Sequence, residues 1–333
     1  MNRRWVFKIL SVSSLSLGLP QFLKASGVVE SDGVTNRGSF SLDGNVLRFS
    51  HPDIHEAFSV TMIADTHLFR DDARGEAYKQ YSGRMAKAYN QTRHFLTGET
   101  ITPEIGFEGA LAAAVEHKSS LIALVGDIFS FPSEAAIEWV AEKMEACGIP
   151  YVYTAGNHDW HYEGMKGTAN QLRETWISKR LSRFYQGRNP MMQVAEVHGV
   201  KFISIDNSTY EINPAQLDFL NLCLADGKPA VLLVHIPLYA AGRSVWFGCG
   251  HPDWNAANDT NFELERRLPW REEGHTRTTL DFYDTVFESK SILGVLAGHI
   301  HNQSVDIING IPQIVTESNA EGGFLQVHFG PMS

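Results

Sequence analysis

Short apolar runs with the length of buried strands alternate along the chain with longer segments of helical periodicity. The strand-like runs cover residues 39–50, 58–64, 121–125, 151–154, 191–197, 201–205, 231–234 and 291–297, with three more near the C-terminus. The helix-like segments cover residues 106–117, 133–146, 168–180, 214–224 and 278–289. This alternation predicts an α/β fold with helices on the faces of a sheet. No internal repeat or Pro/Ser-rich linker interrupts it, so we expect one domain over residues 28–333.

Two segments interrupt the alternation and are expected to be insertions in this domain. Residues 69–103 are polar and helical in part, and we interpret them either as a lid over a substrate site or as a surface helical hairpin. Residues 239–275 are irregular and rich in Gly, Trp, Asn and charged residues. Loops that follow the strands of a site commonly shape specificity, so the second insertion is a candidate for substrate contact.

The first 27 residues have the layout of a bacterial export signal. A basic start with Arg3 and Arg4 precedes a modest apolar stretch, and small residues follow at 25–27. The run from Arg3 to Lys8 resembles the twin-arginine export pattern, and the alternatives are a Sec signal or a frayed basic helix. We therefore expect a periplasmic or secreted protein after removal of residues 1–27. No other stretch of the sequence approaches the roughly 18 apolar residues that a membrane span needs.

Composition argues against several kinds of site. The formal net charge is −10 and no Lys/Arg-rich run is present, so we expect no nucleic-acid-binding surface. The three cysteines, Cys147, Cys223 and Cys249, have no CxxC spacing. They form neither a disulfide framework nor a thiolate metal site, and a single disulfide after export is left open.

The last core strand-like run ends in LAGHIHNQ, residues 296–303, which places histidines at positions 299 and 301. Positions i and i+2 of an extended chain face the same side, about 6–7 Å apart. The two imidazoles are therefore placed to act as metal ligands. Taken alone, the pattern is equally compatible with chance.

Four other core strand-like runs also end in residue types that bind metals. The polar residues are Asp65 and His67, Asp127, the run Asn157-His158-Asp159, and His235. Because ligand sites in open α/β sheets form beyond the carboxyl ends of the strands, we expect these residues to gather with His299 and His301. Each has an ordinary explanation, such as a helix N-cap for Asp127 or a turn for Asn157. Five strand ends of this kind together favour one metal site, and oxygen and nitrogen ligands without thiolates suit Zn, Mn or Fe.

The ordered motifs DTH, GD, GNHD, H and GHIH resemble those of the calcineurin-like metallophosphoesterase superfamily over most of residues 59–303. The resemblance implies a four-layer α/β/β/α sandwich of mixed sheets with a dinuclear metal site at the C-terminal ends of the strands. The residues implied to hold the first metal are Asp65, His67, Asp127 and His301. The residues implied to hold the second are Asp127, Asn157, His235 and His299.

The resemblance also implies catalytic roles and a reaction. His158 would stabilise or protonate the leaving oxygen, and Asp159 would orient its ring. Two metal ions lower the pKa of a bridging water and hold the phosphoryl oxygens during attack. The implied function is hydrolysis of a phosphomonoester or phosphodiester in a small phosphorylated substrate, and the oligomeric state is left open.

Two alternatives remain within this interpretation. Purple acid phosphatases, a branch of the superfamily, have a tyrosine three residues after the GD aspartate; this chain has Ser130, which disfavours a tyrosinate–iron site. The other alternative is a metal-containing binding protein without turnover, which the complete set of motif residues disfavours.

Substrate contacts are expected from loops beside the motifs. Arg243, in the second insertion, has the chemistry to bind a phosphate oxygen. Trp160 and His161 follow the GNHD motif and are expected to line the pocket.

Overall fold

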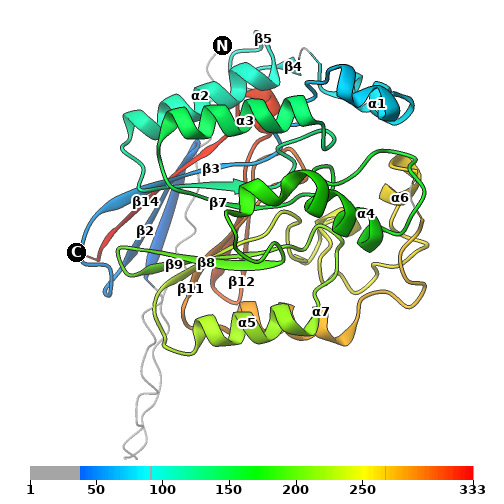
Figure 1. The fold of residues 1–333 in the computed structure, drawn as a ribbon. Helices are drawn as coiled ribbons and strands as arrows, with labels where there is room; N and C mark the ends of the chain where they lie inside the picture. Colours follow the sequence, from blue (N-terminus) through cyan, green and yellow to red (C-terminus); the bar gives the residue numbers. More distant parts are fainter. Residues whose placement is uncertain (1–37, 91, 267, 333) are drawn as a thin grey trace, which may run out of the picture. The chain divides into compact units, whose positions relative to one another are not determined.

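Two six-stranded mixed sheets form the framework of the computed structural model, which describes residues 38–90, 92–266 and 268–332 (Figure 1). The first sheet contains, in spatial order, β1 (Ser39–Asp43), β2 (Val46–His51), β14 (Leu325–Pro331), β3 (Phe58–Ile63), β6 (Leu121–Val125) and β7 (Tyr151–Thr154). The second contains β12 (Ser304–Ile308), β13 (Ile311–Val315), β11 (Ile292–Ala297), β10 (Ala230–Leu233), β9 (Val200–Ile205) and β8 (Met192–Val197).

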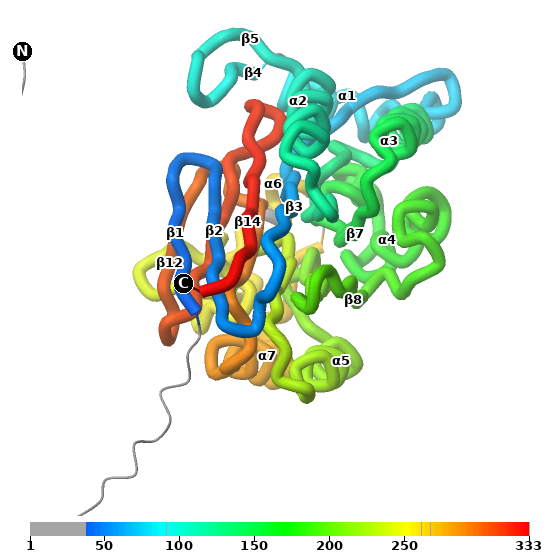
Figure 2. Tube along the Cα trace, turned by 90° about the vertical axis from the view of Figure 1, so that its left-hand side faces the viewer, coloured from blue at the N-terminus to red at the C-terminus, as the bar shows by residue number. Residues whose placement is uncertain are grey.

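The central strands of each sheet run parallel. β3, β6 and β7 share one direction, and so do β9, β10, β11 and β13. In the first sheet β14 lies between β2 and β3, antiparallel to β3 (Figure 2). Parallel strands end at the same edge of their sheet, so the residues that follow β3, β6 and β7 emerge together, as do those that follow β10 and β11.

Helices cover the outer face of each sheet. The first sheet packs against α2 (Pro103–Glu116), α3 (Glu134–Cys147) and α4 (Ala169–Trp176), and the second against α5 (Pro214–Leu224) and α7 (Arg277–Glu288). A separate core cluster contains inner-face residues of both sheets, among them Val60 of β3, Leu233 of β10 and Leu296 of β11. The sheets therefore pack face to face, which is consistent with the expected four-layer α/β/β/α arrangement.

The local sequence explains where these elements form. Strands β3, β6, β10 and β11 are buried at every position, as expected for central strands with both faces covered. Helix α2 begins at Pro103, behind the N-cap Thr102, and α5 begins with a capping box between Asn213 and Gln216. Gly148 ends α3 in the left-handed region, at a φ of 69°.

Three sequence predictions of elements differ from the structure. Residues 39–50, predicted as one strand, form a hairpin, because Gly44 adopts a φ of 58° and turns the chain. The helix predicted over 168–180 is α4 followed by a π-helical turn, Ile177–Leu181. The first insertion is not a helical hairpin. It contains a 3₁₀ turn, Ala73–Tyr78, then α1 (Lys79–Ala88) and a two-residue strand pair, β4 (Thr92–Arg93) with β5 (Thr100–Ile101).

The second insertion is largely irregular, as the sequence predicts. Its short helical pieces are a 3₁₀ turn, Val245–Phe247, and α6 (Asn261–Leu264). The predicted export signal, residues 1–27, lies outside the described residues. The described residues belong to one compact unit, Asn36–Ser333, and none of their helices is long and apolar enough to cross a membrane.

Candidate metal centre

The loops after five strands meet at one edge of the two sheets. Backbone pairing continues past the strand ends, since Asp65 N donates to the carbonyl oxygen of Gly126 at 3.0 Å and Gly298 N donates to that of His235 at 3.0 Å. The structure thereby brings together the residues that the sequence predicts to be metal ligands. Three overlapping groups have ligand atoms within 4.8 Å of one another: Asp65, His67 and His301; His67, Asp127 and His158; Asp127, His235 and His299.

Several of these ligand atoms lie close enough to share one cation. The Nε2 atoms of His67 and His301 are 2.9 Å apart, and His301 Nε2 lies 3.4 Å from Asp65 Oδ1. On the other side, His235 Nε2 lies 3.1 Å from Asp127 Oδ2. Asp127 and His67 each belong to two of the three groups, and the Asp127 carboxylate, which has two oxygens, would be the residue to serve two neighbouring cations.

Hydrogen bonds behind the histidines select which ring nitrogen faces the site. His235 Nδ1 lies 3.0 Å from the carbonyl oxygen of Val125, which only accepts, so Nδ1 carries the proton and Nε2 is available as a ligand. The hydroxyl of Tyr210 lies 2.8 Å from His299 Nε2, which leaves Nδ1 of that ring for the site. Such outer partners orient ligating histidines in metalloproteins.

Asn157 provides a test of whether a cation fits here. Its amide nitrogen donates to Glu265 Oε1 at 2.6 Å. Among the described residues, its Oδ1 is a buried acceptor without a hydrogen-bond donor. A metal ion satisfies such an oxygen, whereas a buried unpaired acceptor is otherwise unfavourable. Cys147, Cys223 and Cys249 are free thiols, and the ligand set is one of carboxylate, amide and imidazole groups.

The electrostatics of the cluster favour the cation-binding forms of His67, His299 and Asp127, whereas His235 holds a proton that a cation would have to displace. Burial and the neighbouring His301 hold the pKa of His67 well below its usual value. Burial and His235 lower the pKa of His299 to about 3. Burial alone would lower the pKa of His235, but Asp127 outweighs it and raises that pKa to about 10. Burial would raise the pKa of Asp127, but His235, His158 and His67 together outweigh burial and hold that pKa well below its usual range. Neutral imidazoles and an ionised carboxylate are the forms that bind a divalent cation.

The backbone is unusual at the predicted ligands. Positive φ angles occur at Asp65 (57°), His67 (50°), Asp127 (50°), His299 (76°) and His301 (59°). Non-glycine residues adopt this left-handed conformation infrequently, and such strain concentrates at functional sites. It turns the chain sharply at each strand end and aims the side chains inward.

Two motif glycines leave room for ligands. A Cβ atom at Gly156 would lie 2.1 Å from Asp127 Oδ1, and one at Gly298 would lie 2.4 Å from Asp65 Oδ2. Any side chain at either position would displace a carboxylate of the cluster. This explains physically why glycine precedes both the NHD and the HIH segments.

His158 lies at the edge of the cluster and faces a cavity. Its backbone N–H donates to Asp127 Oδ1 at 2.8 Å, and 22% of its side chain is exposed. Asp159 does not orient this ring, contrary to expectation. Its two carboxylate oxygens accept the backbone N–H groups of Phe129 (2.8 Å) and Gly156 (2.7 Å), so Asp159 instead holds two loops of the site together.

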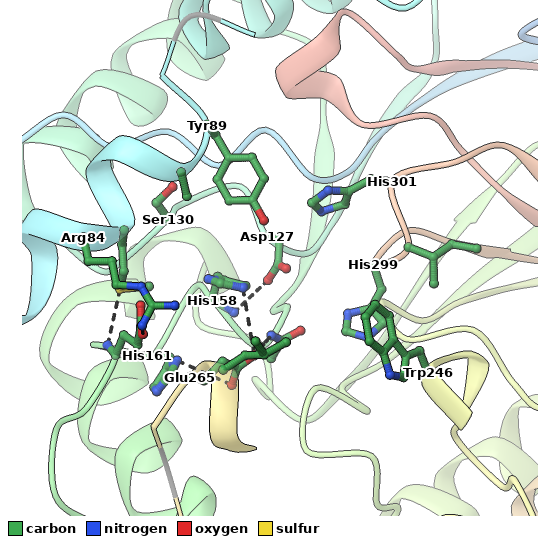
Figure 3. A pocket seen from close by; sticks show the side chains of 16 residues that line it. Arg84, Tyr89, Asp127, Ser130, His158, His161, Trp246, Glu265, His299 and His301 are labelled. Carbon is green, nitrogen blue, oxygen red and sulfur yellow. Dashed lines mark hydrogen bonds and ion pairs between the residues drawn. The ribbon is translucent and has the colours of Figure 1, made fainter. Parts of the chain in front are cut away.

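The cavity in front of the cluster has a volume of about 330 Å³ (Figure 3). Its floor is formed by predicted ligands and by His158, and its walls come from both insertions. The wall residues contributed by α1 and the turn after it are Arg84, Met85, Ala88 and Tyr89. Those contributed by the second insertion are Trp246, Leu264 and Glu265. The first insertion therefore borders the cavity, as the lid interpretation requires.

The model of the calcineurin-like phosphoesterase family matches residues 58–303. The chain belongs to the calcineurin-like phosphoesterase family. It is accordingly a hydrolase of phosphoric ester bonds, and its cluster of aspartates and histidines fits two metal ions.

The phosphoesterase is similar to several known proteins over most of its length. A probable cyclic nucleotide phosphodiesterase from Psychrobacter sp. (strain PRwf-1) is 21% identical over 294 residues, which are 83% of this chain and 76% of that protein. A dimetal phosphatase from Danio rerio has a TM-score of 0.48 at 13% identity, covering 79% of this chain and 88% of that one. The purple acid phosphatase PPD1 from yellow lupin seeds has a TM-score of 0.47 at 13% identity, covering 83% and 46%.

Of the predicted substrate contacts in this phosphoesterase, only His161 lines the cavity. Trp160 is fully buried, and its indole N–H donates to Ser208 Oγ at 2.9 Å. Arg243 is also placed elsewhere: its Nε lies 2.9 Å from Asp306 Oδ1, and its guanidinium lies over a phenylalanine ring. Because Arg243 pairs with a carboxylate and does not line the cavity, the predicted contact between Arg243 and a phosphate oxygen is wrong.

Ser130 occupies the position at which purple acid phosphatases carry tyrosine. Its hydroxyl donates to the carbonyl oxygen of His67 at 2.7 Å, so it supports the backbone of a ligand loop. A different tyrosine, Tyr89, stacks on the His67 ring with centroids 3.9 Å apart. Tyr89, which sequence reasoning missed, comes from the end of α1.

Other site residues that sequence reasoning missed are Arg84, Glu163, Tyr210 and Glu265. None belongs to a family motif, and each reaches the site through the path of a loop or insertion. The one available signal was the helical spacing of Arg84 and Ala88 within the polar first insertion, which places both on one face of a helix.

Proposed function

We propose that this protein is an exported phosphoesterase that hydrolyses a small phosphomonoester or phosphodiester with a metal-activated water. The observation that carries the proposal is the meeting of three overlapping ligand groups, each with at least one member on the cavity floor and with Asp127 shared between two of them. When bound, two divalent ions supply an acidified water and neutralise the phosphoryl oxygens.

Two sets of residues of the chain would hold these two ions. Asp65, His67 and His301 would hold one ion and His235, Asn157 and His299 the other, with Asp127 common to both. Manganese, iron and zinc all suit this ligand set, and availability selects among them.

His158 is the proposed proton donor to the leaving oxygen. Its ring borders the cavity, and its backbone is fixed to Asp127 by the 2.8 Å hydrogen bond. General acid catalysis by a positioned histidine contributes about 10²–10⁴-fold to a rate. The wall residues would contact the organic part of the substrate. The name of the Psychrobacter relative supports a phosphodiester as a first substrate to test.

The proposal is tested with the purified full chain, by metal analysis and by assay of 4-nitrophenyl phosphate and bis(4-nitrophenyl) phosphate. We expect two metals per chain and turnover of at least one substrate. His158→Ala should lower kcat by about 10²–10⁴-fold with both metals retained. A protein that holds two metals and hydrolyses no ester in a broad panel would instead be a metal-containing binding protein.

Export is proposed from the sequence of residues 1–27. The test is fractionation of bacterial cells that produce the full chain, compared with the double variant Arg3→Lys, Arg4→Lys. Export through the twin-arginine route predicts that the unaltered chain reaches the periplasm and that the variant stays in the cytoplasm. Export of both chains would favour a Sec signal.

A further inference from the structure

We propose that Tyr89 is a catalytic residue of the phosphoesterase, whose hydroxyl donates a hydrogen bond to a phosphoryl oxygen of the substrate. This role rests on the proposed function and deepens it, because it adds a contact that none of the family motifs supplies. Tyr89 directly follows helix α1 and belongs to the first insertion. Ser130 occupies the position of the purple acid phosphatase tyrosine, so Tyr89 does not correspond to that residue.

The ring of Tyr89 lies against two predicted ligands of the first metal. It stacks on the His67 ring, with centroids 3.9 Å apart and an interplanar angle of 15°. It meets the His301 ring at a steep angle of 68°, with centroids 5.4 Å apart. Figure 3 shows the Tyr89 hydroxyl directed into the cavity, towards Asp127. The hydroxyl is therefore held beside the cavity floor, where the phosphoryl group of a substrate would lie.

The Tyr89 hydroxyl is available to a substrate. Within residues 38–90, 92–266 and 268–332 it makes no hydrogen bond to a side chain or to the backbone. The side chain is only partly buried and borders the cavity, so a phosphoryl group in the cavity can reach it. The Tyr210 hydroxyl, by contrast, already lies 2.8 Å from His299 Nε2. A phenol is protonated near neutral pH, so Tyr89 has a proton to donate.

The backbone that follows Tyr89 is anchored to a ligand loop. Thr92, three residues further along, donates from its Oγ1 to the carbonyl oxygen of Ala320 at 2.5 Å. The backbone N–H of Ala320 in turn donates to the carbonyl oxygen of Asp65 at 2.9 Å. Together with the stacking on His67, this anchor fixes the hydroxyl before substrate arrives. A donor that is already in position stabilises developing charge without a cost of reorganisation.

The reaction gives such a donor a defined role. A water oxygen forms the new bond to phosphorus, the bond from phosphorus to the leaving oxygen breaks, and His158 gives its proton to that leaving oxygen. The negative charge of the transferred group stays on its other oxygens, which are the acceptors for catalytic donors. The Tyr89 proton remains on the phenol oxygen throughout. Tyr89 therefore contributes stabilisation of the transition state and no proton transfer.

Two substitutions separate the hydroxyl of Tyr89 from its ring. Tyr89→Phe removes the hydroxyl and retains a ring that can stack on His67 in the same way. Tyr89→Leu removes both and reports what the stacked ring contributes. The matched control is Tyr78→Phe in the same insertion. Tyr78 stacks on Tyr162, with centroids 5.0 Å apart, and is not one of the described residues that line the cavity.

The experiment measures kcat/KM for 4-nitrophenyl phosphate and bis(4-nitrophenyl) phosphate in the full chain and in the three variants. Calorimetry gives the dissociation constants of inorganic phosphate and of orthovanadate, and elemental analysis gives the metal content. We expect Tyr89→Phe to lower kcat/KM by about 10²-fold, as the loss of one donor to a developing oxyanion does. Binding of both anions should weaken by about tenfold, while metal content stays unchanged. Tyr78→Phe should alter none of these quantities.

The outcomes separate the role of Tyr89 from the proposed function. Unchanged kcat/KM and anion binding in Tyr89→Phe overturn that role and leave the hydrolase intact, even if Tyr89→Leu is impaired, because only the ring would then matter. Loss of a metal in Tyr89→Phe, or a phenolate-to-metal absorption band that this variant lacks, also overturns it, because Tyr89 would then be a metal ligand. If the unaltered chain hydrolyses neither ester, the proposed function fails, and anion binding still decides whether the Tyr89 hydroxyl donates to such oxygens.

Discussion

The floor and the walls of the cavity are built in different ways. The floor consists of residues at the ends of buried strands, where backbone pairing continues into the loops and where Asp127 and Asn157 are buried. The walls consist of two insertions whose polar side chains are partly exposed, such as Arg84 at 54%. The family's chemistry therefore resides on rigid strand ends, while substrate selection is left to segments that can vary without disturbing the sheets.

The walls are held to the floor by side chains. Glu163 pairs with Arg84 from the first insertion and with Arg266 from the second, so it links the two walls. Tyr89 is stacked on His67 and lies 5.4 Å from the His301 ring, which joins the end of α1 to the ligands. Changes on the floor should therefore abolish metal binding and catalysis, whereas changes on the walls should alter substrate binding.

The largest effect is expected from Asp127→Asn, on the floor. The amide cannot supply the negative charge that two neighbouring cations require, so one or both metals should be lost and kcat/KM should fall by about 10³-fold or more. Metal analysis and steady-state kinetics measure both quantities. Asp226→Asn, which alters a surface carboxylate paired with Lys201 at 2.7 Å, is the control and should change neither. Full activity with two metals in Asp127→Asn would contradict the bridging role.

An intermediate effect is expected from Arg84→Ala, on the wall. Loss of the guanidinium removes a cation from the cavity and leaves Glu163 with the more distant Arg266, so KM should rise by about tenfold while metal content stays unchanged. Arg70→Ala is a matched control in the same insertion, because Arg70 pairs with Glu104 at 3.4 Å outside the cavity lining. A fall in kcat accompanied by metal loss would instead show that Arg84 supports the metal site and not substrate binding.

The smallest effect is expected from Glu211→Gln, which weakens the attachment of the end of the second insertion to the rest of the fold. Glu211 Oε1 accepts the backbone N–H of Thr276 at 3.1 Å, at the start of α7, where the insertion ends. Burial raises the pKa of Glu211, but the His275 imidazole 3.6 Å away and the hydrogen bond from Thr279 outweigh it and leave the pKa lowered. The variant should lose about 1 kcal/mol of unfolding free energy at pH 7 and keep its kcat.

The sign of the pH dependence follows from the lowered pKa of Glu211. Its stabilisation is complete above the pKa of about 4.3 that glutamate has in an unfolded chain, and it is lost as the pH falls through the lower pKa of the folded state. Urea unfolding at a series of pH values should therefore show that the unfolding free energies of the unaltered chain and of Glu211→Gln become equal as the pH falls into the acid range. Glu288→Gln, at the other end of α7 and exposed, is the control. A difference in unfolding free energy that grows as the pH falls would contradict the proposed role of the Glu211 carboxylate.

Sequence reasoning predicted the floor well because its residues are fixed by strand ends. Strand 121–125 had the bounds that the structure shows, and Asp127 follows it by two residues, so its place was set by the sheet alone. The walls could not be predicted in the same way. The partner of Arg243 is Asp306, 63 residues further along the chain, and Glu265 reaches Asn157 across 108 residues of sequence. Such contacts depend on the course of irregular segments, for which neither periodicity nor spacing carries a signal.

The left-handed backbone at five predicted ligands has a consequence for engineering this protein. Each non-glycine residue in that conformation costs roughly 1–2 kcal/mol relative to glycine, and the rest of the fold must compensate. Glycine would relax the chain at any of these positions and would also delete a ligand. Selection of this protein for thermal tolerance alone would therefore favour replacements that remove its metal site, so a screen for stability has to be paired with a screen for turnover.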